Sequence, residues 1–438
     1  MDGLRLDATQ QIFDSSPEHI IRVLSCAARQ AAIAPASSSP SGRQKIQKPR
    51  SSRGNEALKS QRTSEKRIDQ SLVTSAATIS LKPSTLEPRS IFLVAENEAQ
   101  QTILARTLDQ GGYGLDALWN DDFHHSAMVA LTGRAEAYYS DYRGTPQEFI
   151  SALKWGFLYQ GQWYSWQKKY RGSPSFGLHP QQFVIFLQNH DQVANSLRGF
   201  RIRHLTSPGR LRAMTALLLL APGTPMLFQG QEFGASTPFL FFADHNPDLA
   251  KLVARGRKEF LSQFSSVAAV EKEFSQAKAT GQVLPPDCLS DPCSEETFSR
   301  CKLDFSERAK HGAIYRLHKD LLQLRRNDPV FSSPRPGGLD GAVLGPEAFV
   351  LRFFGAGTAS SPRQNGQDRL LLVNLGPALH LSSAPEPLLA PLVGTKWTLL
   401  WSSEHPFYGG SGTPTFGAAE HYLLPGQAAV VLATTPMD

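Results

Sequence analysis

The sequence predicts an α/β protein that carries five strands of a (β/α)8 barrel, followed by an antiparallel β-sandwich. In the first 265 residues, short apolar runs alternate with segments of helical periodicity, and each run ends in a cluster of polar residues. Buried strands that alternate with helices form parallel sheets, and a barrel of this type carries its chemistry at the carboxyl ends of its strands. From about residue 337 the pattern changes to short strands between turns, which is typical of a sandwich.

The predicted strands and helices of the barrel follow one another in a simple order. A helix is expected after the first strand, because Ser16 and Pro17 supply a cap and a first-turn proline ahead of the apolar positions from Ile20 to Cys26. Helical spacing also appears over 99–108, 149–157 and 211–218. A complete barrel needs eight strands, so we expect a partial one. The predicted strands are 3–9, 90–96, 113–119, 183–191 and 224–232.

Changes of pattern along the chain predict three parts. Residues 1–265 form the partial catalytic barrel, residues 266–336 a linker with a helical segment, and residues 337–438 the C-terminal β-sandwich. The helical segment has apolar residues from Ile314 to Leu324 at spacings of three and four, which indicates a helix that faces the core. The sandwich strands are expected at 348–354, 369–374, 397–401 and 428–432.

The positive charge of the protein is concentrated in one segment. Nine basic and two acidic residues lie between 41 and 67, so this stretch accounts for more than the whole formal charge of +6. Residues 33–89 also lack aromatic residues and are rich in Ser, Pro, Gln and Ala, so they cannot bury enough apolar surface to offset the entropy of ordering. We predict a disordered basic insertion. The alternative, an arm that binds nucleic acid, is disfavoured because no stacking aromatics are present.

Composition excludes several classes of protein. A hydrophobic content of 41% rules out global disorder, and four cysteines in 438 residues, with no leader at the start, argue against a secreted disulfide scaffold. We therefore expect a cytoplasmic protein. The longest apolar stretch, 213–221, is far shorter than the roughly 20 residues that span a bilayer, so no membrane anchor is expected. The oligomeric state is left open.

Three carboxylates stand at the ends of three predicted strands: Asp7, Glu96 and Asp191. Cleavage of a glycosidic bond with retention needs a carboxylate nucleophile and a second carboxyl group, about 5 Å away, that protonates the leaving oxygen. Arg5 precedes Asp7 by two residues on one strand, so both side chains point to the same face and Arg5 keeps Asp7 ionised. We expect Asp7 and Glu96 within roughly 5 to 6 Å of each other, with Asp191 facing the same cleft and Glu96 held protonated.

Three of these motifs resemble three of the four short regions that define the α-amylase family of glycoside hydrolases. They are Gly3 to Ala8, the apolar run that ends in Ala95-Glu96, and Asn189-His190-Asp191. Within that family, the run from Trp119 to His125 resembles the maltooligosyltrehalose trehalohydrolases. Further segments of the same resemblance are 131–133, 138–139, 238–245, 256–260, 386–391 and 401–404.

The resemblance implies roles and a reaction. Asp7 would be the nucleophile, Glu96 the general acid/base and Asp191 the transition-state stabiliser. The expected reaction is hydrolysis of the α-1,4 bond next to the terminal trehalose unit of maltooligosyltrehalose or a related α-glucan, which releases trehalose without a cofactor. The resemblance also implies that the five strands are barrel strands 4 to 8 and that strands 1 to 3 are missing. The strand that carries Asp7 would then be a sheet edge with unpaired backbone groups and without the packing of a closed barrel, so we expect this chain alone to be a poor enzyme. Substrate binding would involve Arg5, Asn189, His190, Trp119, Asp122 and His125.

Other interpretations stay open at this point. For Trp119 we weigh barrel core against an exposed indole that stacks on a glucose ring. The carboxylates and histidines of 121–125 could look like a metal cluster, but adjacent histidines diverge in most backbones, so we expect no metal site. Rival functions are an α-glucan branching enzyme of the same superfamily, which should lack the run 119–125, and a noncatalytic remnant that at most binds glucan.

Overall fold

The computed structural model describes residues 3–33, 91–279, 291–355, 368–381, 385–413 and 422–437. The predicted disordered insertion at 33–89 therefore lies outside the described residues, apart from Ile33 at its start.

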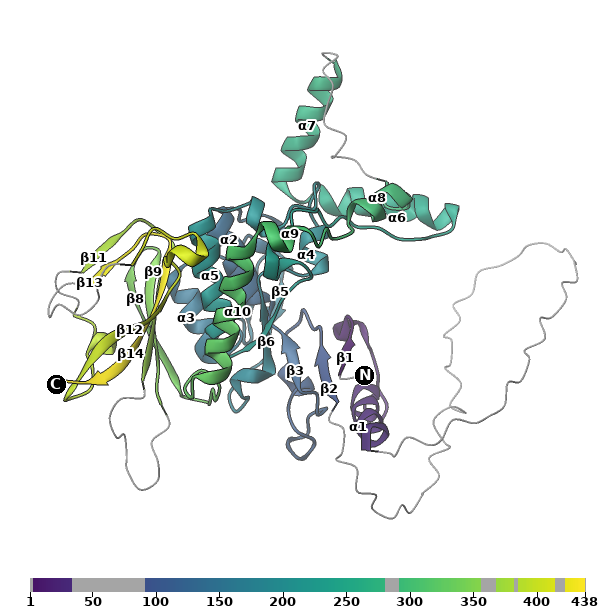
Figure 1. Cartoon of the computed structure of the whole chain (residues 1–438). Coiled ribbons are helices and arrows are strands. Elements are labelled where there is room, and N and C mark those ends of the chain that lie inside the picture. Colours follow the sequence, from purple (N-terminus) through teal and green to yellow (C-terminus); the bar gives the residue numbers. More distant parts are fainter. Residues whose placement is uncertain are drawn as a thin grey trace, which may run out of the picture.

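Five parallel strands form one open sheet, and their order in the sheet follows their order in the chain (Figure 1). Each strand falls within one of the predicted apolar runs. Each pairs in parallel with the next, and the first pair aligns residues 3–6 with residues 92–95. Chain order of this kind is the order of successive strands in a barrel. The strands are β1 (Gly3–Leu6), β2 (Phe92–Ala95), β3 (Ala117–Trp119), β6 (Phe183–Phe186) and β7 (Thr224–Met226).

The strands of this sheet differ in how deeply they are buried. All four residues of β6 are buried, as expected for a strand covered on both faces, whereas most of β1 is exposed because β2 is its one partner among the described strands. Helix α1 (Ile20–Ile33) lies beside β1 and β2, and its Ile21 joins a small core with Leu93 (Figure 1). The helix continues to Ile33, about two turns beyond the apolar positions that end at Cys26.

Short polar side chains fix where the helices begin. The Asn120 side chain accepts a hydrogen bond from the Phe123 backbone N–H at 3.2 Å, and the Asn189 side chain accepts one from Gln192 N–H at 2.8 Å. Each cap satisfies an otherwise unpaired N–H of the first turn. These two helices, α2 (Asp121–Thr132) and α4 (His190–Ala194), begin directly beyond strand ends. The other barrel-side helices are α3 (Pro146–Trp155), α5 (Pro208–Leu220) and α6 (Pro247–Leu261).

Some elements depart from the sequence prediction. The helix expected over 99–108 is two 3-10 turns, Thr102–Leu104 and Leu108–Gln110, and a hairpin of β4 (Gln162–Tyr164) and β5 (Lys169–Arg171) was not expected. The predicted linker is mostly helical, and α7 extends away from the rest of the molecule (Figure 1). Its helices are α7 (Ser265–Ala279), α8 (Glu295–Arg300), α9 (Glu307–Lys310) and α10 (Gly312–Asn327).

The C-terminal part is an antiparallel sheet of five strands in the order β12-β14-β10-β9-β8, accompanied by the two-stranded sheet β11-β13. The four strands predicted here are present, and β8, β11 and β13 are additional. All six residues of β9 are buried, because one face of the sheet packs on helices and the other on residues of its own part. The strands are β8 (Leu339–Gly345), β9 (Ala348–Phe353), β10 (Arg369–Asn374), β11 (Leu379–Leu381), β12 (Thr395–Ser402), β13 (Tyr422–Leu424) and β14 (Ala428–Pro436).

One hydrophobic core joins the parallel sheet to the C-terminal sheet. Helix α5 is buried all round from Ala213 to Leu220, which marks a helix enclosed on every side. The core also includes Ile185 of β6 and Val431 of β14, and the buried rings of Phe149 and Phe349 stack with centroids 5.8 Å apart. The two sheets therefore share their burial rather than folding as separate cores.

Of the helices in the described part of the chain, none combines the length and the apolar character needed to cross a lipid bilayer.

The shared core predicts a large and cooperative loss of stability when it is cut. Phe349→Ala should reduce the free energy of unfolding by about 3–5 kcal/mol, because it removes a fully buried ring that joins α3 to β9. Urea denaturation measures the loss. Phe176→Ala, at an exposed ring, is the control and should change stability by no more than about 0.5 kcal/mol. A small effect of Phe349→Ala, or separate transitions for the two sheets, would contradict a shared core.

Candidate active site

The first two carboxylates lie at the carboxyl ends of adjacent parallel strands. Leu6 pairs with Ala95, so the next residues, Asp7 and Glu96, both emerge at the same edge of the sheet. The ladder continues beyond the strands: Glu96 N–H donates to the Leu6 carbonyl at 2.9 Å, and Thr9 N–H donates to the Glu96 carbonyl at 3.0 Å. The backbone thus holds the two carboxylates side by side.

Arg5 connects the two carboxylates. Its Nη2 atom lies 2.7 Å from Asp7 Oδ1 and 2.5 Å from Glu96 Oε2. Because one nitrogen touches both oxygens, the two carboxyl groups are within the reach required for joint action on one bond. The Arg5 guanidinium also lies over the ring of Trp119, with its carbon 4.2 Å from the ring centroid, and this cation–π contact favours its position.

The environment of Glu96 favours its protonated form. Partial burial is the main cause, and a hydrogen bond with the Asp7 side chain adds to it; together they raise the pKa of Glu96 to about 7. The charge of Arg5 and the Ala8 N–H act in the opposite direction, and the charge of Asp191 raises the pKa further. Near neutral pH, a proton is therefore available on Glu96 for donation.

The backbone after Asp7 adopts an unusual conformation. Ala8 has a φ of 42°, in the left-handed region that residues with a Cβ rarely enter. Its N–H points at Glu96 Oε2 over a distance of 3.3 Å. A strained residue of this kind costs on the order of 1–3 kcal/mol, and such residues concentrate at functional sites.

Asp191 lies in the first turn of helix α4, which follows strand β6 and a short loop. The buried Asn189 caps this helix, and His190 Nε2 lies 3.2 Å from Asp191 Oδ2. The side chains of His190 and Asp191 are about half exposed, so they are open to a substrate. The charge of Asp191 acts on Glu96, which shows that the third carboxylate shares the electrostatic neighbourhood of the first pair.

Trp119 is buried rather than exposed. Its side chain is 6% exposed, with Arg5 over one ring face and Phe186 and His190 at centroid distances of 5.3 and 6.3 Å. Of the two expectations for this indole, the environment matches barrel core, and the ring supports Arg5.

Asp122 and His125 lie beneath the surface of the site. Asp122 accepts hydrogen bonds from the Tyr142 hydroxyl at 2.6 Å and from the Leu158 N–H at 2.7 Å, and its side chain is fully buried. Burial lowers the pKa of His125 well below its ordinary value, so the imidazole is neutral. In the described residues no group of three His, Cys, Asp or Glu side chains is arranged to hold a metal ion.

Two residues near the carboxylates were not singled out as binding residues. Asp121 is packed against the buried Arg171 at 3.8 Å, and burial raises its pKa to about 6. Arg257 on α6 donates to the Asn195 side chain at 2.7 Å and to the Ala194 carbonyl at 2.9 Å, which anchors the end of α4. The position of Asp121 beside Asp122 was a signal, whereas no pattern marks Arg257.

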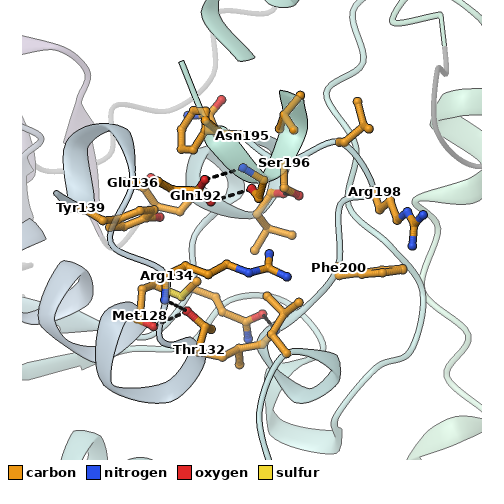
Figure 2. Close-up of a pocket in the computed structure, with 18 of the residues that line it drawn as sticks. Met128, Thr132, Arg134, Glu136, Tyr139, Gln192, Asn195, Ser196, Arg198 and Phe200 are labelled. Carbon is orange, nitrogen blue, oxygen red and sulfur yellow. Dashed lines mark hydrogen bonds between the residues drawn. The ribbon is translucent and has the colours of Figure 1, made fainter. Parts of the chain in front are cut away.

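A separate pocket of about 160 Å³ lies beyond helix α4 (Figure 2). Arg134 extends into it, and Glu136 forms the opposite wall, where its carboxylate accepts hydrogen bonds from the Ser266 N–H and hydroxyl at 2.7 and 2.6 Å. The pocket includes Gln192 but not Asp7, Glu96 or Asp191. It is therefore adjacent to the carboxylates but separate from them.

A domain family described as a domain of unknown function (DUF3459) matches residues 336–431. Curated relatives match a larger part of the chain. The malto-oligosyltrehalose trehalohydrolase of Deinococcus radiodurans is 38% identical over 266 residues, which is 60% of this chain and 40% of that protein. The one from Arthrobacter ramosus is 35% identical over 58% of this chain and 42% of that protein. The chain thus spans about two fifths of the length of these relatives.

A solved structure is also similar to this chain. A structure named "Putative alpha Amylase from Salmonella typhimurium" has a TM-score of 0.64 and 28% identity, and covers 99% of this chain and 57% of that one. The resemblance expected from the motifs is therefore confirmed: in sequence the chain is similar to malto-oligosyltrehalose trehalohydrolases, and in fold it is similar to the structure named "Putative alpha Amylase".

Proposed function

We propose that this chain carries the catalytic carboxylates of a retaining glycoside hydrolase that cleaves the α-1,4 bond next to the terminal trehalose unit of maltooligosyltrehalose. The observation that carries the proposal is the Arg5 guanidinium in contact with both Asp7 and Glu96, where the pKa of Glu96 is raised to about 7. One carboxylate held beside a cation and a second held protonated are the pair that retaining hydrolysis requires.

The proposed reaction has two steps. Asp7 attacks the anomeric carbon while Glu96 gives its proton to the glycosidic oxygen, so the C–O bond breaks, trehalose leaves and a glycosyl ester forms on Asp7. Glu96, now ionised, takes a proton from water; the water oxygen bonds to the anomeric carbon and the ester bond to Asp7 breaks. Asp191 stabilises the positive charge that the sugar acquires in both steps.

The remaining binding residues divide into two groups by exposure. His190 is open to a sugar hydroxyl, while Asn189 holds His190 and Asp191 in place by capping α4. Trp119 supports Arg5 from below. Asp122 and His125 are buried below the surface of the site and would support it rather than contact the sugar. Asp122 fixes the backbone at Leu158 by accepting a hydrogen bond from its N–H.

The substrate and the architecture of the proposal rest on similarity. The names of the curated relatives support a trehalose-capped α-glucan, and in the proposal the five parallel strands are taken as barrel strands 4 to 8. The rival branching activity forms branched glucan instead of trehalose, so analysis of the products separates the two. A noncatalytic remnant would form neither product.

Trapping of the covalent intermediate tests the proposed nucleophile. Glu96→Gln supplied with maltosyl fluoride should gain the mass of one maltosyl unit on the peptide that contains Asp7, because fluoride departs without an acid whereas hydrolysis of the ester lacks its base. Peptide mass spectrometry locates the label. Asp7→Asn is the matched control and should remain unlabelled. Labelling at another residue, or none in Glu96→Gln, would overturn the assignment of Asp7.

The raised pKa of Glu96 predicts the shape of the pH profile. Since protonated Glu96 is the acid, trehalose release from maltotriosyltrehalose should fall as pH rises through about 7. Glu96→Gln should lower the rate by about 10²–10⁴-fold and remove that limb of the profile. Gln192→Glu is the control: it adds a carboxyl group to α4, beyond the carboxylate pair, and should keep the limb of the profile. A limb that persists in Glu96→Gln would assign the acid to another residue.

A further inference from the structure

A second cavity, of about 140 Å³, lies under the loops that carry the site. It is lined by α5, α10 and the turn that follows β7. Three arginines contribute to its wall, and among the described residues that line it there is no aspartate or glutamate. The lining therefore has a positive character, which is unusual for the interior of a protein.

Three deeply buried side chains in this wall each have a nitrogen with no hydrogen-bond partner in the protein. The atoms are Arg201 Nη2, Gln231 Nε2 and His318 Nε2, on side chains of residues that are 2%, 7% and 4% exposed. Buried polar groups are nearly always satisfied, and leaving one unpaired costs about 1–3 kcal/mol. Three around one cavity indicate that the cavity holds something that binds them.

The remaining atoms of these side chains fix what each nitrogen offers. Gln231 Oε1 accepts from the Phe228 N–H at 3.3 Å, so the NH₂ group is the one that faces the cavity. His318 Nδ1 lies 2.9 Å from the Ile314 carbonyl and must donate to it, so Nε2 of the neutral ring is an acceptor. The cavity thus offers a cationic donor, an amide donor and one acceptor.

The Arg201 guanidinium has no carboxylate in contact among the described residues. Its Nε donates to the Thr237 carbonyl at 2.6 Å and its Nη1 to the Gln229 carbonyl at 2.7 Å. Burial lowers the pKa of Arg201. Another arginine of the same wall, Arg212, is by contrast paired with Glu404 at 2.7 Å. The charges of Glu232 and Glu307 act on Arg201, but neither carboxylate contacts its guanidinium, so an anion in direct contact would stabilise this buried cation.

We propose that this cavity binds a small monovalent inorganic anion of the halide class, held by Arg201 Nη2 and Gln231 Nε2. A water molecule bound beside the anion donates to His318 Nε2. The volume of about 140 Å³ has room for the anion and several water molecules, because each water occupies about 30 Å³ and a halide is of similar size. The proposal is independent of the proposed function, since none of these groups belongs to the carboxylate pair.

The anion would stabilise the chain beyond α4 and the loops around Gln231, which Arg201 connects. Through its two carbonyl bonds, Arg201 ties the chain beyond α4 to the loops on both sides of Gln231. An anion beside the guanidinium offsets the cost of burying its charge, and because it binds only the folded protein it should raise the stability by mass action.

Bromide is the probe for the experiment. Crystals of the whole chain soaked in sodium bromide should give an anomalous peak within hydrogen-bond distance of Arg201 Nη2 and Gln231 Nε2. In solution, bromide should raise the Tm saturably by about 2 °C or more relative to sodium gluconate at equal ionic strength.

Three variants assign the effect to the cavity. Arg201→Gln should abolish the bromide response. Gln231→Glu should abolish it too, because one carboxylate oxygen can keep the Phe228 bond while the other replaces the anion, and this variant does not remove the guanidinium. The matched control is Arg325→Gln: Arg325 also binds only backbone carbonyls, those of residues 219, 221 and 223, but it lies outside the cavity, so its loss should leave the response intact.

Two results would overturn the proposal. One is water alone in the cavity, with bromide found only as an adventitious ion at the surface. The other is a bromide response that persists unchanged in Gln231→Glu.

Discussion

The contact of Arg5 with two carboxylates is the interaction on which the rest of the site depends. Arg5 and Asp7 point to one face of β1 because side chains alternate along a strand, and the parallel register brings Glu96 to the same edge. The guanidinium could not hold this position alone, since a flexible side chain at a strand end has many alternatives. The ring of Trp119 on β3 restricts it, so three neighbouring strands each contribute one part of a single charged cluster.

The surrounding fold keeps the ends of these strands in fixed positions relative to one another. Helix α5 is buried on every side between the parallel sheet and the C-terminal sheet, and so β6 cannot shift without disturbing β9 and β14. Asp191 follows β6, and the Asn189 cap of α4 holds it in place relative to that strand. At the opposite edge, β1 is covered less well, and its position is fixed mainly by pairing with β2 and by the ladder that continues through Glu96 and Thr9.

Local patterns predicted the parts of the molecule that depend on nearby residues. Each of the five parallel strands lies in an apolar run that ends in polar residues, and the position of Asp7 next to Glu96 follows from the strand order. The features that the sequence did not predict depend on tertiary contacts or have short or weak patterns. Asp122 is buried by Tyr142 and by the backbone near Leu158, which no pattern around residue 122 reveals. The strands β4 and β5 are only three residues long, and the sequence of α7 is weakly amphipathic. Neither element therefore gives a clear periodic signal in the sequence.

Arg5 holds Asp7 and Glu96 together in such a way that Glu96 keeps its proton near neutral pH. An NMR titration of the Glu96 side-chain carboxyl carbon, assigned by comparison with Glu96→Gln, measures this directly. We expect a midpoint at about pH 7, and a lower midpoint in Asp7→Asn, because the Asp7 hydrogen bond contributes to the raised pKa of Glu96. A Glu96 carboxyl that titrates near 4.5, unchanged by Asp7→Asn, would contradict this expectation.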